Sequence, residues 1–376
     1  MEGVNAPSCG PAGERGSESV RVRILVIALA GIGDCLIATP LIHELRLQYP
    51  EAALEALVFW PGSRDLLEGN PHLNTIHQKN LVQEGYLRSV RYLLGLRRRR
   101  YDLSINAHPQ GRIHYRLAAG LIQAKRRLSH RYEKYTWLDR WLVTRTLPQD
   151  YSVHSIENNR RLLTLLDLEP RLARPEMEIY LSAEDLSWAE EFARRHNLGG
   201  RVCLGVHVGS GGTKNLKFKR WPLGHYMELL AELMRRHPEL AVLLFGGPEE
   251  EEAHREILAR PVTSRAITVP SRTLKQAAAL MKHCRAFLSV DTALMHVAAA
   301  MKVPRQVVIE APTLNPTNLP WNNGCRVVRN PMVNGRNLEY YRYDGGPIRG
   351  TPEHLAACMA SVTVTEVLRA VEEAIP

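Results

Sequence analysis

The most constraining feature of this sequence is a strand, a glycine turn and a helix that follow one another directly near its start. The residues at 22–29 are almost all apolar, which predicts a buried parallel strand. Gly31 and Gly33 end this run, and a helix with apolar residues at helical spacing begins at Asp34. A strand, turn and helix in this order form the place where open α/β sheets bind their ligands.

Asp34 needs an explanation, because the amides at such a turn attract an anionic ligand and this sequence places its own carboxylate there. An acidic residue in the first helical turn is commonly a cap. Known nucleotide-binding motifs do not fit, since Leu36 stands where the third glycine of G-x-G-x-x-G would fall and no Gly-Lys-Ser/Thr follows. Asp34 is therefore either a helix cap or a general base at the mouth of a cleft.

Strand–helix units continue on both sides of a proline-containing linker at 169–175. This alternation predicts parallel sheets covered on both faces, and 376 residues suffice for two domains. We predict an α/β fold in which two Rossmann-like domains face each other across a cleft. The expected division is a disordered tail at 1–20, a first domain at 21–170 and a second at 171–376. The last helix, near 363–374, is a candidate to pack back on the first domain.

The composition is that of a soluble globular protein, with 45% hydrophobic and 23% charged residues. No apolar run reaches transmembrane length, and the first twenty residues lack the apolar core of a signal peptide. The six cysteines form no C-x-x-C pair, which favours reduced thiols in a cytoplasmic protein and gives no reason to expect zinc.

Positive charge is concentrated in the segment 81–150, which holds fifteen Lys/Arg against five Asp/Glu. Its net charge of +10 equals that of the whole chain. The clusters at 97–100 and 125–127 are interleaved with Tyr132, Tyr135, Trp137 and Trp141. This pattern suits an anionic membrane surface or a phosphorylated acceptor, but also nucleic acid or a plain solvated face.

Two loops of the second half carry candidate anion-binding groups. In the first, at 207–222, three glycines precede a cluster of cations that ends in Lys219 and Arg220. Such a loop is either a phosphate site or a flexible surface loop, and we expect Lys219 to be exposed.

In the second loop, a strand ends at Asp291 and Thr292 and a helix begins. The helix amides and the Thr292 hydroxyl are suited to a diphosphate. Asp291 would repel a diphosphate, so it is expected to hold a sugar hydroxyl or a lysine. A plain cap explains Asp291 equally well, and His296 is similarly open to both a functional and a structural role.

Taken together, three motifs resemble those of the lipopolysaccharide heptosyltransferase family, which are inverting, sugar-nucleotide-dependent glycosyltransferases of GT-B fold. They are Gly31-Ile-Gly-Asp34, Lys219-Arg-Trp-Pro222 and Asp291-Thr-Ala-Leu-Met-His296. Segments at 101–106, 124–127 and 154–159 are also similar, so the resemblance covers about 21–330 in consistent order.

The resemblance implies a role for each matching residue. Asp34 corresponds to the catalytic base, Lys219 to a phosphate-binding lysine, and Glu250 to an acid near the ribose. The remaining donor-side residues are Ser210, Gly211, Gly212, Thr213, Asp291, Thr292, Ala293 and His296, and the acceptor-side residues are Gly33, Arg112, Lys125 and Arg126. Without an Asp-x-Asp pair, protein cations are expected to replace Mg²⁺ or Mn²⁺, so neither a metal nor a cofactor is expected.

The implied partners are a nucleoside-diphosphate sugar, ADP-linked, and an anionic glycolipid such as lipopolysaccharide core at the inner face of the cytoplasmic membrane. Nucleic acid is not an expected partner. The implied sugar is a heptose or a similar one. Departures from the family pattern bear on the sugar rather than on the reaction type, and they are Ala293, Asn106, the segment 310–313 and a long segment at 334–351.

Two other function classes remain open at this stage. A nucleotide-sugar epimerase shares the two-lobed architecture, although the Asp-Thr-x-x-x-His order fits transfer better. A basic nucleic-acid-binding protein would explain the charged segment but would leave both glycine loops without a role.

Overall fold

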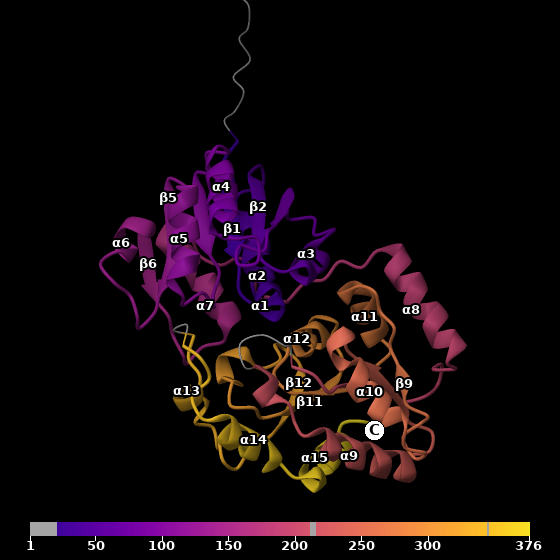
Figure 1. Cartoon of the computed structure of the whole chain (residues 1–376). Helices are drawn as coiled ribbons and strands as arrows, with labels where there is room; N and C mark the ends of the chain where they lie inside the picture. Colours follow the sequence, from indigo (N-terminus) through magenta and orange to yellow (C-terminus); the bar gives the residue numbers. More distant parts are fainter. Residues whose placement is uncertain (1–20, 211–215, 344–345) are drawn as a thin grey trace, which may run out of the picture.

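The computed structural model describes residues 21–210, 216–343 and 346–376, which form two α/β lobes joined by a linker (Figure 1). The predicted tail at 1–20 lies outside the described residues. The upper lobe in Figure 1 is N-terminal and the lower lobe is C-terminal.

A six-stranded sheet of parallel pairs forms the N-terminal lobe. Its order is β3 (Thr75–Gln78), β2 (Ala53–Val58), β1 (Arg23–Ala28), β4 (Leu103–Asn106), β5 (Arg126–Arg131) and β6 (Arg145–Pro148). In the central strand, five of six residues are buried, because side chains on both faces pack against helices.

Helices cover both faces of this sheet. One face packs against α1 (Ile32–Ile37), α2 (Thr39–Gln48) and the 3₁₀ helix η1 (Leu162–Leu166), which continues α7 (Ser155–Arg161). The other face packs against α4 (Tyr86–Arg97) and α5 (Ile113–Ile122), beside which lies α6 (Asp139–Leu142). The remaining helix, α3 (Pro61–Leu67), follows β2.

The C-terminal lobe repeats this design. Its sheet runs β12 (Gly324–Val328), β11 (Arg305–Ile309), β10 (Ala286–Ser289), β7 (Cys203–His207), β8 (Ala241–Phe245) and β9 (Ile267–Thr268). In both sheets the first strand of the lobe lies beside the fourth, so the order of the strands across the sheet reverses at this pair. These switch points, β1/β4 and β7/β10, are where doubly wound sheets bind ligands.

The remaining elements of the C-terminal lobe are α-helices and short 3₁₀ helices. They are α8 (Ala183–Arg195), η2 (Leu216–Lys219), α9 (Leu223–Arg236), η3 (Pro248–Glu250), α10 (Glu251–Leu258), α11 (Leu274–Met281), α12 (Ala293–Ala300), η4 (Pro316–Asn318), α13 (Asn337–Tyr340), α14 (Pro352–Ala360) and α15 (Val364–Glu372).

The last helix differs from expectation. Instead of returning to the N-terminal lobe, α15 packs on α9, where Leu368 and Val371 join the cluster that contains Leu230. Trp221 Nε1 also donates a hydrogen bond of 2.9 Å to the carbonyl of Val362, just before this helix. The apolar stripe of α15 is therefore satisfied within its own lobe.

The carboxyl edges of the two sheets face each other, as the α1–α12 contact and several bonds between the lobes show (Figure 1). The carboxylate of Asp65 accepts a 2.6 Å bond from the Leu274 amide, and Ser155 Oγ donates one of 2.6 Å to Asn318. Within the three described ranges, no single helix has the length and apolar composition to cross a membrane, although α14 and α15 taken as a bent pair meet that test by length and composition alone.

Candidate functional site

Asp34 lies in the first turn of α1, directly after β1. Its Oδ2 accepts a 2.7 Å hydrogen bond from the Gly31 amide, so the carboxylate does cap its own turn. This carboxylate is half-buried, and its charge contributes, after burial, to raising the pKa of Tyr115 in its own lobe and of Tyr341 in the other. The cap and the base are thus compatible roles for this side chain.

In the C-terminal lobe, Lys219 and Asp291 form a largely buried ion pair. Lys219 Nζ lies 3.4 Å from Asp291 Oδ2, which also accepts a 2.9 Å hydrogen bond from Thr313 Oγ1. Asp291 thus holds a lysine, one of its two expected roles. The expectation that Lys219 is exposed is wrong, since it is only 6% exposed.

Thr292 is the N-cap of α12, and Ala293 is the first residue of that helix. Thr292 Oγ1 accepts from the Met295 amide at 3.4 Å and lies 3.2 Å from Nδ1 of His207. Burial lowers the pKa of His207 to about 3, with smaller contributions from His254, Arg220 and Lys219, so its imidazole is neutral. The amides at the start of α12 lie next to the Lys219–Asp291 pair.

A second cluster joins the loops that follow β7 and β8. Arg220 donates a 3.2 Å bond to Ser210 Oγ and lies 3.6 Å from the buried carboxylate of Glu250. Glu250 also accepts from the Gly247 amide at 2.9 Å. Burial raises the pKa of Glu250, while Gly247 and Arg220 oppose that rise. The predicted residues Gly211, Gly212 and Thr213 lie outside the described residues.

Gly33 and His296 pack against each other where the two lobes meet. A Cβ placed on Gly33 would lie 2.5 Å from His296 Cδ2 and 3.4 Å from the Ala293 Cα. Burial lowers the pKa of His296 to about 4, so the imidazole packs here in its neutral form. The lack of a side chain at Gly33 therefore allows the close approach of α1 to α12, and its acceptor-side role stays a prediction.

Tyr341 and Tyr343 belong to the site, and the sequence analysis missed them. Burial mainly raises the pKa of Tyr341, and the charges of Asp34 and Asp291 both add to the rise. The ring of Tyr343 stacks edge-on against His108 of the N-terminal lobe, with centroids 5.0 Å apart. The unexpected length of 334–351 was the available signal, because this segment brings both tyrosines to the other lobe.

The four acceptor-side residues separate in space. Arg112 is the N-cap of α5, at the carboxyl edge of the sheet, and its charge acts against the raised pKa of Tyr341. Lys125 and Arg126 lie at the amino end of β5, with Arg126 beside Leu103 in the register. A six-residue strand such as β1 spans roughly 20 Å, so their predicted place on the acceptor side is corrected to the opposite edge of the sheet.

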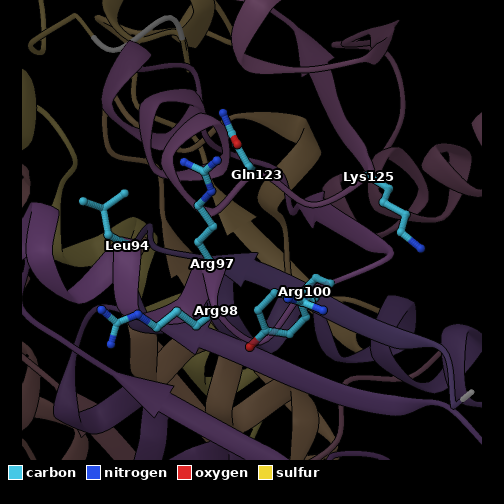
Figure 2. A pocket seen from close by; sticks show the side chains of 7 residues that line it. Leu94, Arg97, Arg98, Arg100, Gln123 and Lys125 are labelled. Atoms are coloured by element: carbon cyan, nitrogen blue, oxygen red, sulfur yellow. The ribbon is translucent and has the colours of Figure 1, made fainter.

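Lys125 instead borders an open pocket of about 610 Å³ at that opposite edge (Figure 2). Arg97, Arg98 and Arg100 line it together with Gln123, and Figure 2 shows these side chains between Leu94 and Lys125. The pocket is basic and lies at the ends of α4 and α5, away from both switch points.

An exposed apolar surface adjoins this pocket. Of the ten large apolar side chains exposed in the described part of the chain, seven lie between 82 and 141, on or beside α4, α5 and α6. Trp137 and Trp141 are each 74% exposed. Tyr132, which the sequence grouped with them, is buried instead, because its hydroxyl accepts from the Gln110 amide at 2.8 Å. We call the surface formed by α4, α5 and α6 the basic–aromatic face.

Comparisons with known proteins all lead to one family of glycosyltransferases. The model of glycosyltransferase family 9 (heptosyltransferase) matches residues 90–341. Lipopolysaccharide heptosyltransferase 2 of Salmonella typhimurium is 28% identical over 332 residues, which are 82% of this chain and 88% of that protein.

Two solved structures share the fold. A family 9 glycosyltransferase from Veillonella parvula has a TM-score of 0.73 at 21% identity, covering 94% of this chain and 97% of that one. The ADP-heptose lipopolysaccharide heptosyltransferase II of Escherichia coli has a TM-score of 0.67 at 23% identity, covering 94% and 98%.

Proposed function

The chain belongs to glycosyltransferase family 9, and on that premise we propose that it transfers a heptose or similar sugar from an ADP-linked donor to an anionic glycolipid such as lipopolysaccharide core. One observation carries the proposal: the Asp34 carboxylate and the buried Lys219–Asp291 pair stand at the switch points of two sheets whose carboxyl edges face each other. The relative from Salmonella typhimurium is named for the same acceptor class.

The C-terminal lobe, 171–376, is the proposed donor lobe. Lys219 and the first amides of α12 supply positive charge where a diphosphate would lie, which stabilises the charge of the departing nucleotide. When the diphosphate takes Lys219, the Asp291 carboxylate becomes available to a sugar hydroxyl, while Thr313 keeps it oriented. These protein groups replace a divalent cation on the diphosphate.

The N-terminal lobe, 21–170, is the proposed acceptor lobe. The acceptor hydroxyl oxygen attacks the anomeric carbon from the side opposite the diphosphate, and its proton passes to the Asp34 carboxylate. The bond between the anomeric carbon and the diphosphate oxygen breaks, and its electron pair leaves with the nucleotide. The Gly31 amide holds the carboxylate in place, and the configuration at the anomeric carbon is inverted.

The basic–aromatic face is the proposed contact with the membrane. Tryptophan and tyrosine side chains prefer the membrane–water interface, and lysine and arginine are attracted to anionic lipid headgroups. Both kinds of side chain are exposed on this face, with Trp137 and Trp141 on or beside α6 and Arg97 and Arg98 at the end of α4. We propose that the enzyme docks through this face on the cytoplasmic surface of the membrane that holds its acceptor.

The test is a donor panel with a defined acceptor. Purified protein is incubated with lipopolysaccharide precursor lacking heptose and with ADP-, GDP- or UDP-linked sugars, in excess EDTA. We expect a mass gain of one heptose only from ADP-heptose, and a product with inverted anomeric configuration by NMR. Transfer from a GDP or UDP donor alone, or activity that EDTA abolishes and Mn²⁺ restores, would contradict the proposal.

A further inference from the structure

Three side chains from separate parts of the chain meet beside the linker, away from the site described above. His43 lies on α2, His72 follows α3, and Glu178 belongs to the segment that leads into the C-terminal lobe. His43 Nδ1 lies 2.7 Å from Glu178 Oε1, and His72 Nε2 lies 3.5 Å from Glu178 Oε2. The two imidazole rings stack with centroids 3.9 Å apart.

This donor set and its spacing suit a borderline metal ion. One ligand atom from each residue lies within 4.8 Å of the others. Tetrahedral zinc with bonds of about 2.0–2.2 Å places its ligand atoms roughly 3.3 Å apart, close to the separations seen here. Two imidazole nitrogens and one carboxylate oxygen are a common zinc-binding combination.

The surroundings also favour a bound cation. The three side chains are 15–24% exposed, so the position is enclosed but open to solvent. Burial, and then the neighbouring His43, lower the pKa of His72. The backbone of Glu178 is bonded to α2, because its amide donates a 3.0 Å hydrogen bond to Thr39 Oγ1. Tyr180 OH, 3.3 Å from His72 Nε2, is close enough to serve as a fourth ligand or to hold a water there.

One nearby charge opposes cation binding. Arg46 contributes to the lowered pKa of His72. Its guanidinium, however, is occupied by backbone carbonyls, with bonds of 2.7 Å to Pro50 and 2.9 Å to both Ala52 and His72. It therefore weakens the site without blocking it.

We propose that His43, His72 and Glu178 form a Zn²⁺ site that fastens the linker to α2 of the N-terminal lobe. Zinc binds between His43 Nδ1 and the Glu178 carboxylate in place of their hydrogen bond, and the metal-bound imidazole carries its N–H hydrogen on Nε2 instead. The site is structural and stands apart from the proposed transfer chemistry. The cysteine pattern gave no sign of it, because these three residues have no motif spacing.

The experiment uses the untagged full chain with Cys9 changed to serine, after treatment with EDTA. The binding of Zn²⁺ is measured by calorimetry in two buffers of different ionisation enthalpy. We expect one Zn²⁺ per chain and an unfolding midpoint raised by several degrees. His72→Ala and Glu178→Gln should each weaken binding by at least roughly tenfold to a hundredfold. His114→Ala, which changes an exposed histidine on α5, should bind as the parent does.

Glu178→Gln nearly preserves the side-chain shape and keeps the backbone bond to Thr39. It therefore tests zinc binding even if the alanine variant does not fold. Co²⁺ provides a second readout, since its absorption spectrum should report nitrogen ligation in the parent and lose that signature in Glu178→Gln. No saturable binding by the parent, or one-to-one binding that persists in both cluster variants, would overturn the proposal and leave an ordinary ion pair.

Discussion

In the N-terminal lobe, the turn after the first strand presents a carboxylate to the other lobe, whereas the matching loop of the C-terminal lobe leads to a buried lysine. The two sheets have the same strand order, and both turns stand at a switch point. The difference teaches that the fold supplies the position and the loop supplies the charge. Facing lobes with opposite loop chemistry divide the proposed reaction into proton removal on one side and diphosphate binding on the other.

The largest expected effect comes from removing the carboxylate on the N-terminal side. Asp34→Asn should lower kcat by about 10²–10⁴-fold, because an amide cannot take the acceptor proton. The asparagine oxygen can still accept from the Gly31 amide, so the cap should survive. The measurement is steady-state transfer at saturating donor.

Asp185→Asn is the matched control for that variant. Asp185 caps α8 in the same way, accepting a 2.9 Å bond from the Ser182 amide, but it lies outside the site. Its turnover should equal that of the parent. Turnover near the parental value in Asp34→Asn would leave Asp34 as a cap only.

The second effect concerns the basic–aromatic face, which the C-terminal lobe lacks. Changing Arg97, Arg98 and Arg100 to glutamine should weaken binding to anionic vesicles about a hundredfold, since each cation near such a surface contributes roughly 1 kcal/mol. Flotation at low salt measures this, with neutral vesicles for comparison.

The control moves the same charge change to the other lobe. Arg260, Arg272 and Lys282 are exposed there, and their replacement by glutamine should leave flotation nearly unchanged. Equal losses in both triple variants would mean that net charge, and not this face, governs vesicle binding.

A third, smaller effect tests the diphosphate side. Lys219→Met should weaken ADP binding roughly tenfold to a hundredfold, the usual range for a hydrogen bond to a charged group. Some stability should be lost as well, because Lys219 is buried and pairs with Asp291. Lys217→Met, at an exposed neighbouring lysine, should change neither quantity. Unchanged ADP affinity in Lys219→Met would remove this lysine from the donor site.

The smallest effect concerns the contact that joins the two sides. Gly33→Ala inserts a Cβ against His296 and should cost about 1–3 kcal/mol of stability, with a lower transfer rate. Gly95→Ala is the control, because a Cβ there meets nothing within 4 Å, and helix propensity should make it neutral or stabilising. Thermal unfolding of both variants decides whether α1 and α12 meet in solution as they do here.

Much of the architecture could be predicted from local patterns. Apolar runs such as 22–29, 241–245 and 286–290 gave the central strands, and their alternation with helices gave two lobes. Family membership confirms the glycosyltransferase prediction over the epimerase and nucleic-acid alternatives. Strand β5 was not predicted, because its buried centre is short and stands between charged residues in the sequence Arg126-Arg-Leu-Ser-His-Arg131.

The site was harder to predict where tertiary contacts decide it. Spacing placed Lys125 and Arg126 near other cations, but only the register shows that they lie at the amino end of β5. Thr313 and Tyr341 come from segments that depart from the family pattern, so resemblance could not point to them. His43, His72 and Glu178 meet only because the linker crosses α2.

The division of labour between the two lobes is tested most directly by measuring ADP affinity and single-turnover rate together in Asp34→Asn and Lys219→Met. The account predicts opposite patterns. Asp34→Asn keeps the parental ADP affinity and loses the transfer step at saturating donor. Lys219→Met loses more in ADP affinity than in the rate of the transfer step at saturating donor. If Asp34→Asn instead loses ADP affinity while its transfer step is unchanged at saturating donor, the assignment of proton removal to the N-terminal switch point is contradicted.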